Sequence, residues 1–326
     1  MVAPDPSRVR FEGPWKHRDV HANGIRFHVA EAGPTGPDVP TVLLLHGFGE
    51  FWWTWRNQLR ALADAGIRAF AIDLRGYGDT DKPPRGYDGW TLAGDTAGLV
   101  RALGLQDAII VGHAEGGLVC WATAALHPRQ VRAIAVIGSP HPMSVKRAAL
   151  RDRNQRVALT RALLPFQVPW LPERRLVRDD GAYAEEMLRQ RSGVAWVRSA
   201  DFPEVARNAR MAVQIPGAAH CALEYHRWAF RSQFRSDGRR FFRSMRQKLP
   251  QPVLQIHGAA DPFILAGSLY RDKTWAPNRE LQIVYGVGHF VHEEAPDLVS
   301  SRLIEFVRAR TGTGSHAGTG SDGVER

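Results

Sequence analysis

The sequence predicts an α/β fold, in which a doubly wound, mostly parallel β-sheet carries an inserted helical segment. Short apolar runs without polar alternation recur along the chain, as in strands that are buried on both faces of a parallel sheet. Amphipathic stretches of helical length separate most of these runs. The alternation stops at Pro140 and resumes only at Pro252, and the long segment between them has a helical composition.

Each element of the predicted sheet has its own signal. Residues 16–33 form two alternating runs joined by Asn23-Gly24, a pair typical of a type I′ hairpin turn. Buried strands are expected at residues 41–47, 67–73, 107–113, 132–138, 252–258 and 281–288. The amphipathic helices between them are expected at Trp55–Ala65, Trp90–Leu103 and Gly116–His127.

The same pattern predicts the domain organisation. Residues 1–142 and 249–312 form the sheet-bearing core, and residues 143–248 form a helical cap. The tail at 313–326 is predicted to be disordered, because its Gly, Ser and Thr residues cannot bury apolar surface.

The composition excludes several classes of protein. With 326 residues, 44% of them apolar, the chain can bury a large core. Cys120 and Cys221 suit neither a disulfide framework nor a metal-ligand spacing, so we expect two small core residues and neither metal nor cofactor. The sequence has no signal-peptide pattern and no apolar run long enough to cross a bilayer, which predicts a cytoplasmic protein.

Positive charge is concentrated in the predicted cap. The net charge is +10, and residues 144–250 hold 22 Lys and Arg against 10 Asp and Glu. Aromatic residues are not interleaved with these cations, so we expect no nucleic-acid partner. Solvated helix faces are the favoured interpretation, and peripheral contact with an anionic membrane is the alternative. The oligomeric state is not predicted.

A strand-turn-helix motif follows the apolar run at 107–113. Its residues, Gly112-His113-Ala114-Glu115-Gly116-Gly117, have the spacing of a nucleophile elbow. Flanking glycines are needed because the turn is too sharp for side chains, and the central residue is presented at the helix N-terminus. That central residue is Ala114, which has no reactive group.

Five segments together resemble cap-bearing α/β-hydrolases, and most closely actinobacterial epoxide-hydrolase-like proteins. The resemblance covers residues 15–310, and it implies the α/β-hydrolase fold and hydrolysis of a small apolar molecule at an ether bond. The segments, in chain order, are VLLLHGFGEFWWTWR, AIDLRGYGDTDKPPRGYD, VGHAEGG, HGAADP and GVGHFVHEEAPD.

The resemblance implies a catalytic role for three positions. In that family, position 114 would be Asp, which opens an epoxide through an alkyl-enzyme ester, or Ser, which forms an acyl-enzyme. Asp261 matches the charge-relay acid and His289 matches the base. Such a pair can deprotonate water, because the carboxylate holds the imidazole in one tautomer and stabilises its protonated form.

The implied oxyanion donors are the backbone N–H groups of Phe48 and Glu115. The Glu115 side chain could replace the missing carboxylate, but we expect it to point away from the apex of the elbow. Trp53 is expected to line the substrate pocket, although a core role is equally open for it.

Two tyrosines of the cap protonate the opened epoxide in that family. No tyrosine occurs between His141 and Ala182, where the first would lie near Phe166. The second position aligns with His226, one residue after Tyr225. We expect Phe166, Tyr225 and His226 to line the pocket, and His226 is either a proton donor or a surface residue.

These observations predict an epoxide-hydrolase-like enzyme with a His289–Asp261 pair and Ala114 at the nucleophile position. Three explanations of Ala114 remain open. The chain is an engineered nucleophile-to-Ala variant of an epoxide hydrolase or serine esterase, or a natural enzyme in which His289 activates water directly. The third explanation is a small-molecule binding protein that keeps the pocket and has lost turnover.

Overall fold

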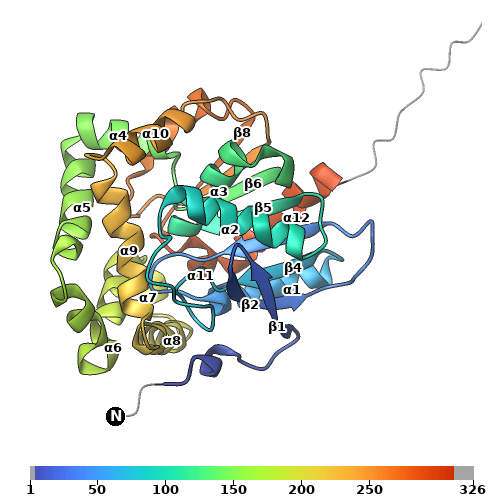
Figure 1. Cartoon of the computed structure of the whole chain (residues 1–326), viewed down its shortest axis with the longest axis horizontal. Helices are drawn as coiled ribbons and strands as arrows, with labels where there is room; N and C mark the ends of the chain where they lie inside the picture. The colour runs from blue at the N-terminus through green and yellow to red at the C-terminus, as the bar shows by residue number, and fades with distance from the viewer. Residues whose placement is uncertain (1–3, 312–326) are drawn as a thin grey trace, which may run out of the picture.

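An eight-stranded sheet forms the centre of the computed structural model, which describes residues 4–311 (Figure 1). The strand order is β1-β2-β4-β3-β5-β6-β7-β8. β1 (Lys16–Ala22) and β2 (Ile25–Ala32) pair antiparallel, and β2 is also antiparallel to β4. All other neighbours are parallel, which confirms the predicted fold class. The predicted tail at 313–326 lies outside the described residues.

The strands follow the apolar runs closely. The run predicted as a strand at 281–288 ends at Val284, because the chain then turns at Gly286, whose φ is 77°. The later strands are β3 (Thr41–Leu45), β4 (Arg68–Ile72), β5 (Ala108–His113), β6 (Val131–Ile137), β7 (Val253–Gly258) and β8 (Arg279–Val284).

Helices cover both faces of the sheet. Along β3, Leu43 and Leu45 pack into the apolar cluster that includes residues of α2 and α3, whereas Val42 and Leu44 pack into the cluster with α1 and α12. This alternation is expected for a strand that is buried between two helical layers. The covering helices are α1 (Arg56–Asp64), α2 (Gly89–Ala102), α3 (Ala114–Leu126) and α12 (Pro296–Thr311), with the short α11 (Val291–Glu294) before the last.

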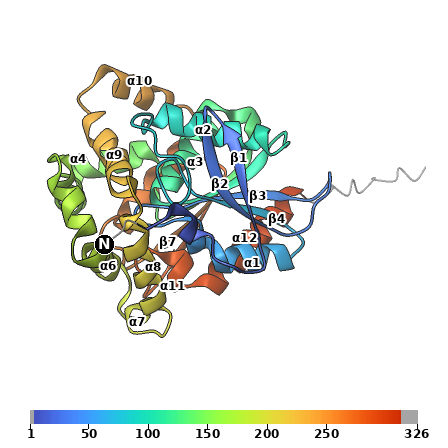
Figure 2. The same cartoon turned by 60° about the horizontal axis from the view of Figure 1, so that its bottom comes forward.

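All the helices between β6 and β7 lie together on one side of the core (Figures 1 and 2). α6 is interrupted at residues 178–181, where three consecutive residues have positive φ. No helix within residues 4–311 has the length and apolar character needed to cross a membrane. The helices of this segment are α4 (Pro142–Arg151), α5 (Arg153–Leu163), α6 (Leu171–Arg191), α7 (Val194–Val197), α8 (Phe202–Gln214), α9 (Ala218–Arg231) and α10 (Ser236–Ser244).

Candidate active site

The turn between β5 and α3 is as sharp as the sequence predicts. Ala114, the first residue of α3, has a φ of 46°, a left-handed conformation that costs energy for a residue with a Cβ. A Cβ added to Gly112 would lie 2.3 Å from the carbonyl oxygen of Gly116, and one added to Gly116 would lie 2.2 Å from that of Leu45. Neighbouring backbone atoms therefore leave no room for a side chain at either position, and both must be glycine.

Asp261 and His289 lie together beside this turn. His289 Nδ1 is 2.6 Å from Asp261 Oδ2, and both side chains are buried. The other carboxylate oxygen, Oδ1, accepts hydrogen bonds from the N–H groups of Phe263 and Ile264 at 2.8 and 2.9 Å. Burial alone would raise the pKa of Asp261, but the charge and hydrogen bond of His289 hold it below the usual value. The carboxylate is thus ionised and fixed against the imidazole.

The side chain of Glu115 turns back toward the elbow, and the expectation that it points away is wrong. Its Oε2 accepts a hydrogen bond from the Phe48 N–H at 2.8 Å, and its Oε1 lies 2.9 Å from Nε2 of His226. Burial alone would raise the pKa of Glu115. The charge and contact of His226 and two backbone N–H groups lower that pKa to about 2, so the carboxylate is ionised.

Comparison with known proteins identifies the family of the chain. The model of the alpha/beta hydrolase fold family matches residues 40–296. The AB hydrolase superfamily protein YfhM of Bacillus subtilis is 32% identical over 295 residues, which are 89% of this chain and 96% of that protein. The chain belongs to the α/β hydrolase fold family.

Further relatives of this α/β hydrolase carry more specific names. Epoxide hydrolase 4 of Homo sapiens is 29% identical over 296 residues, covering 90% of this chain and 78% of the human protein. The crystal structure of epoxide hydrolase A from Mycobacterium thermoresistibile is 28% identical, with a TM-score of 0.72. That similarity covers 90% of this chain and 98% of the mycobacterial chain.

Two of the hydrolase's predicted pocket residues, Phe166 and His226, pack against Phe48. The ring of Phe48 stacks on Phe166, with centroids 5.6 Å apart, and His226 stands edge-on to both rings. Phe166 and His226 come from the cap, and both are buried. His226 is therefore not a surface residue, which removes one of the two interpretations that the sequence left open.

Tyr225 is placed differently from the prediction. Its hydroxyl donates a hydrogen bond to the carbonyl oxygen of Arg75 at 2.8 Å, and its ring packs against Tyr77 and Tyr87. Successive helical residues point about 100° apart, so His226 and its neighbour cannot both face the same group. The Tyr225 hydroxyl is bound to the backbone, and this placement does not support its prediction as a pocket residue.

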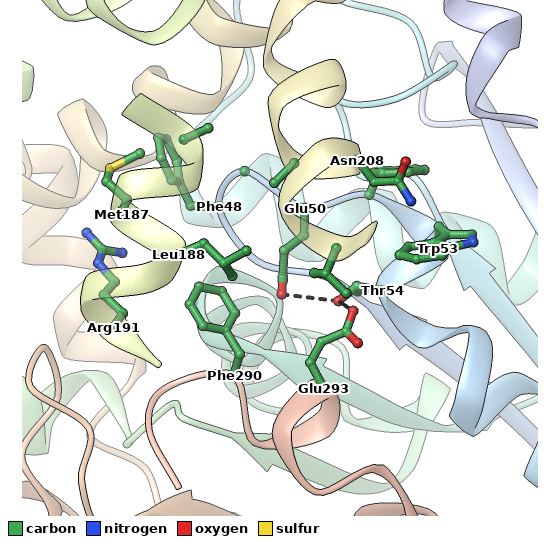
Figure 3. A pocket seen from close by; sticks show the side chains of 15 residues that line it. Phe48, Glu50, Trp53, Thr54, Met187, Leu188, Arg191, Asn208, Phe290 and Glu293 are labelled. Atoms are coloured by element: carbon green, nitrogen blue, oxygen red, sulfur yellow. Dashed lines mark hydrogen bonds between the residues drawn. The ribbon is translucent and has the colours of Figure 1, made fainter. Parts of the chain in front are cut away.

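A cavity of about 40 Å³ separates α6 and α8 of the cap from the loop after β3 (Figure 3). Its wall includes Phe48 and Trp53, so the predicted pocket residue Trp53 does face the space beneath the cap. Ala114 and His289 do not line this cavity, and the ionisable groups of the candidate site meet at the elbow instead. Only a few water molecules would fit in the cavity, which is too small for an organic substrate.

Arg191 links the cavity to His289. Arg191 is the last residue of α6, and its carbonyl oxygen accepts a hydrogen bond from the His289 N–H at 2.8 Å. Its guanidinium lies 4.4 Å from the ring centroid of Phe263, and its side chain lines the cavity. Sequence analysis did not identify Arg191, because nothing in the arginine-rich cap distinguishes it from its neighbours.

A buried polar network behind the elbow was also not predicted. Glu50 accepts hydrogen bonds from the N–H of Gly47 and from Nδ1 of His113, while His113 Nε2 lies 3.1 Å from the His289 carbonyl oxygen. Ligand atoms of Glu50, His113 and His292 lie within 4.8 Å of one another, close enough for a metal ion. Because Glu50 and His113 already have protein partners, the arrangement fits a hydrogen-bond network that joins the loop after β3 to the elbow.

Proposed function

We propose that this α/β hydrolase opens an epoxide on an apolar small molecule, and that the His289–Asp261 pair activates the water that completes hydrolysis. The observation that carries the proposal is the 2.6 Å contact between these two buried side chains. An imidazole held in this way can take a proton from water and return it to the leaving oxygen. The names of the human and mycobacterial relatives support the choice of an epoxide as the electrophile.

The energetic cost of the pair also favours turnover over simple binding. A buried carboxylate beside an imidazole loses hydration, and it adds little affinity for an apolar ligand. A site that serves only to bind such a ligand does not require this pair.

A binding protein is the second candidate function, and one observation favours it. Ala114 stands at the apex of the turn, where its methyl group cannot attack a substrate. A receptor that descended from an enzyme would have this feature, because it needs the pocket and not the nucleophile.

Turnover and binding can be measured on the same proteins. The unchanged chain, His289→Ala and Asp261→Asn would be incubated with aliphatic and aromatic epoxides, and diol formation followed by chromatography. Tryptophan fluorescence would report binding in parallel. We expect diol formation by the unchanged chain, a loss on the order of 1000-fold in either variant, and similar affinities in all three. Binding without turnover in every protein would favour the receptor.

A further inference from the structure

We infer that the Glu115 side chain supplies the reacting carboxylate that position 114 lacks, and that His226 is the proton donor beside it. The inference rests on the proposed epoxide hydrolysis, and it names the groups that carry out its covalent step. Neither role follows from the family motif, which places the nucleophile at position 114.

The position of the Glu115 carboxylate is the first argument. The N–H groups of Phe48 and Glu115 are the two donors expected to stabilise an oxyanion at the elbow. One of them donates to Glu115 Oε2 at 2.8 Å, and the other also favours the ionised form of the same side chain. The Phe48 donor is thus directed at a carboxylate, which places that carboxylate at the reacting centre.

The unsatisfied ring of His226 is the second argument. Only 3% of this residue is exposed, and neither ring nitrogen has a hydrogen-bond partner among the described residues. Its Nε2 lies 2.9 Å from Glu115 Oε1, but the N–H direction does not fit a hydrogen bond along this contact. Burying such a group without a hydrogen-bond partner is unfavourable, and an oxygen atom of a substrate beside Glu115 would provide that partner.

The third argument is that Glu115 and His226 belong to different parts of the structure. Glu115 belongs to α3 of the core and His226 belongs to α9 of the cap. Closing the cap over a substrate therefore brings an acid to the carboxylate, and opening it separates them. An enzyme that must admit its substrate through cap movement gains a complete site only in the closed form.

The acidity of Glu115 decides which role it can take. A carboxylate whose pKa is about 2 is too weak a base to deprotonate water, but it is fully ionised and can attack carbon. The His289–Asp261 pair remains the group suited to water activation. The two pairs therefore have separate tasks, and neither replaces the other.

The first covalent step forms an ester. A Glu115 carboxylate oxygen bonds to one epoxide carbon, and the bond from that carbon to the ring oxygen breaks. The ring oxygen takes the electron pair and then a proton from His226 Nε2. The product is a hydroxyalkyl ester of Glu115.

The second step hydrolyses this ester. His289 takes a proton from water, and the water oxygen adds to the ester carbonyl carbon, where the Phe48 N–H stabilises the oxyanion. Collapse expels the diol oxygen, which takes the proton from His289. The remaining carboxylic acid returns its proton to His226, so the enzyme is restored and one water molecule has been consumed. The regenerated Glu115 carboxylate now contains an oxygen atom from water.

A single turnover in heavy-oxygen water tests this sequence of steps. The protein, in excess over styrene oxide, would react once and then be digested for mass spectrometry. We expect the heavy oxygen in the peptide that contains Glu115 and an unlabelled diol. Heavy oxygen in the diol alone would show that water attacks the epoxide directly, which overturns the role of Glu115 and leaves the proposed function intact.

Trapping the ester tests the same inference without steady-state turnover. His289→Gln should accumulate an adduct on Glu115 when treated with a panel of epoxides, and the double variant with Glu115→Gln should form none. Glu204→Gln, at an exposed position of α8 in the same helical segment, is the matched control and should behave like the unchanged chain. If the unchanged chain yields no diol and His289→Gln yields no adduct, both the proposed function and this inference are wrong.

Steady-state rates separate the two roles. We expect Glu115→Gln to lower kcat on the order of 1000-fold or more, as loss of a nucleophile does. His226→Gln should lower kcat about 100-fold while the ester still forms slowly, because a proton donor assists the step without making the bond. Equal kcat values for His226→Gln and the unchanged chain would overturn the role of His226.

Discussion

The carboxylate of Glu115 accepts a hydrogen bond from the backbone nitrogen of Phe48 at 2.8 Å, and this contact joins the start of α3 to the loop after β3. Unpaired N–H groups and a favourable dipole make such a helix start attractive to a negative charge. The side chain of the second helical residue therefore turns back over the elbow. A substitution at position 115 should change both the charge of the site and the stability of the loop.

Glu115→Gln should make the protein less stable at neutral pH, by at most about 3 kcal/mol. The folded-state pKa of Glu115, about 2, lies below its ordinary value of 4.5, so the carboxylate contributes stability above about pH 4.5. This contribution is lost as the pH falls through the folded value. The difference in unfolding free energy between the two proteins should therefore shrink between pH 5 and pH 3, as measured by urea denaturation. A constant difference over this range would contradict the assignment.

The sheet could be predicted from the sequence because it depends on local patterns, and the Asp261–His289 pair could be predicted from the resemblance to α/β-hydrolases. Apolar runs mark strands buried on both faces, and the Gly-rich turn after 107–113 is readable from its spacing. The order of acid and base along the chain then places Asp261 and His289 at neighbouring strand ends. Their hydrogen bond at 2.6 Å was expected, while their catalytic role stays a prediction.

The surroundings of Glu115 could not be predicted in the same way. Whether His226 or Tyr225 faces the elbow depends on the rotation of α9 against the core, and no spacing in the sequence fixes that angle. The network of Glu50, His113 and His292 could not be predicted either, because it joins three segments that are distant in the sequence. Tertiary contacts between segments that are far apart decide these positions.

Gly116→Ala should destabilise the protein by about 3 kcal/mol or prevent folding, because its new methyl group would meet the Leu45 carbonyl at 2.2 Å. Backbone of β3 and α3 would have to separate to relieve this contact. Gly267→Ala is the control, since a Cβ there meets nothing within 4 Å. Thermal unfolding should give a lower Tm for the first variant only. Similar Tm values for both variants would argue against a tightly closed elbow.

Arg227→Lys should loosen the segment of the cap that holds Phe166. The buried guanidinium donates to the carbonyl oxygens of Phe166 and Val168 and pairs with Glu173 at 2.7 Å. A lysine cannot make these three contacts at once, so we expect a loss of about 2–4 kcal/mol in unfolding free energy. Urea denaturation measures it.

The exposed Arg243→Lys, on α10 of the same helical segment, provides the matched control for Arg227→Lys and should stay within about 0.5 kcal/mol of the unchanged chain. Hydrogen exchange should also rise around residues 165–168 in Arg227→Lys alone. Protection there that matches the control would show that other contacts hold this segment.

Ala114→Asp tests whether a nucleophile at the apex competes with Glu115. Aspartate tolerates the left-handed conformation of residue 114, so the variant should fold. Two carboxylates would then lie side by side, and their repulsion raises the pKa of one of them. The Phe48 N–H is already bound to Glu115, so the new aspartate lacks a donor.

We therefore expect Ala114→Asp alone to hydrolyse epoxides at least about 10-fold more slowly than the double variant Ala114→Asp with Glu115→Gln. In the double variant the residue beside the aspartate is neutral, so the oxyanion donors are available to the aspartate. The acidic limb of the rate profile should also lie at higher pH in the single variant, because one carboxyl group must lose its proton beside another charge. Stopped-flow measurement of ester formation between pH 4 and pH 9 gives both quantities. Equal rates and superimposable profiles would show that Glu115 does not engage the donors of the reacting centre, and the unchanged chain would then have no carboxylate in position to attack.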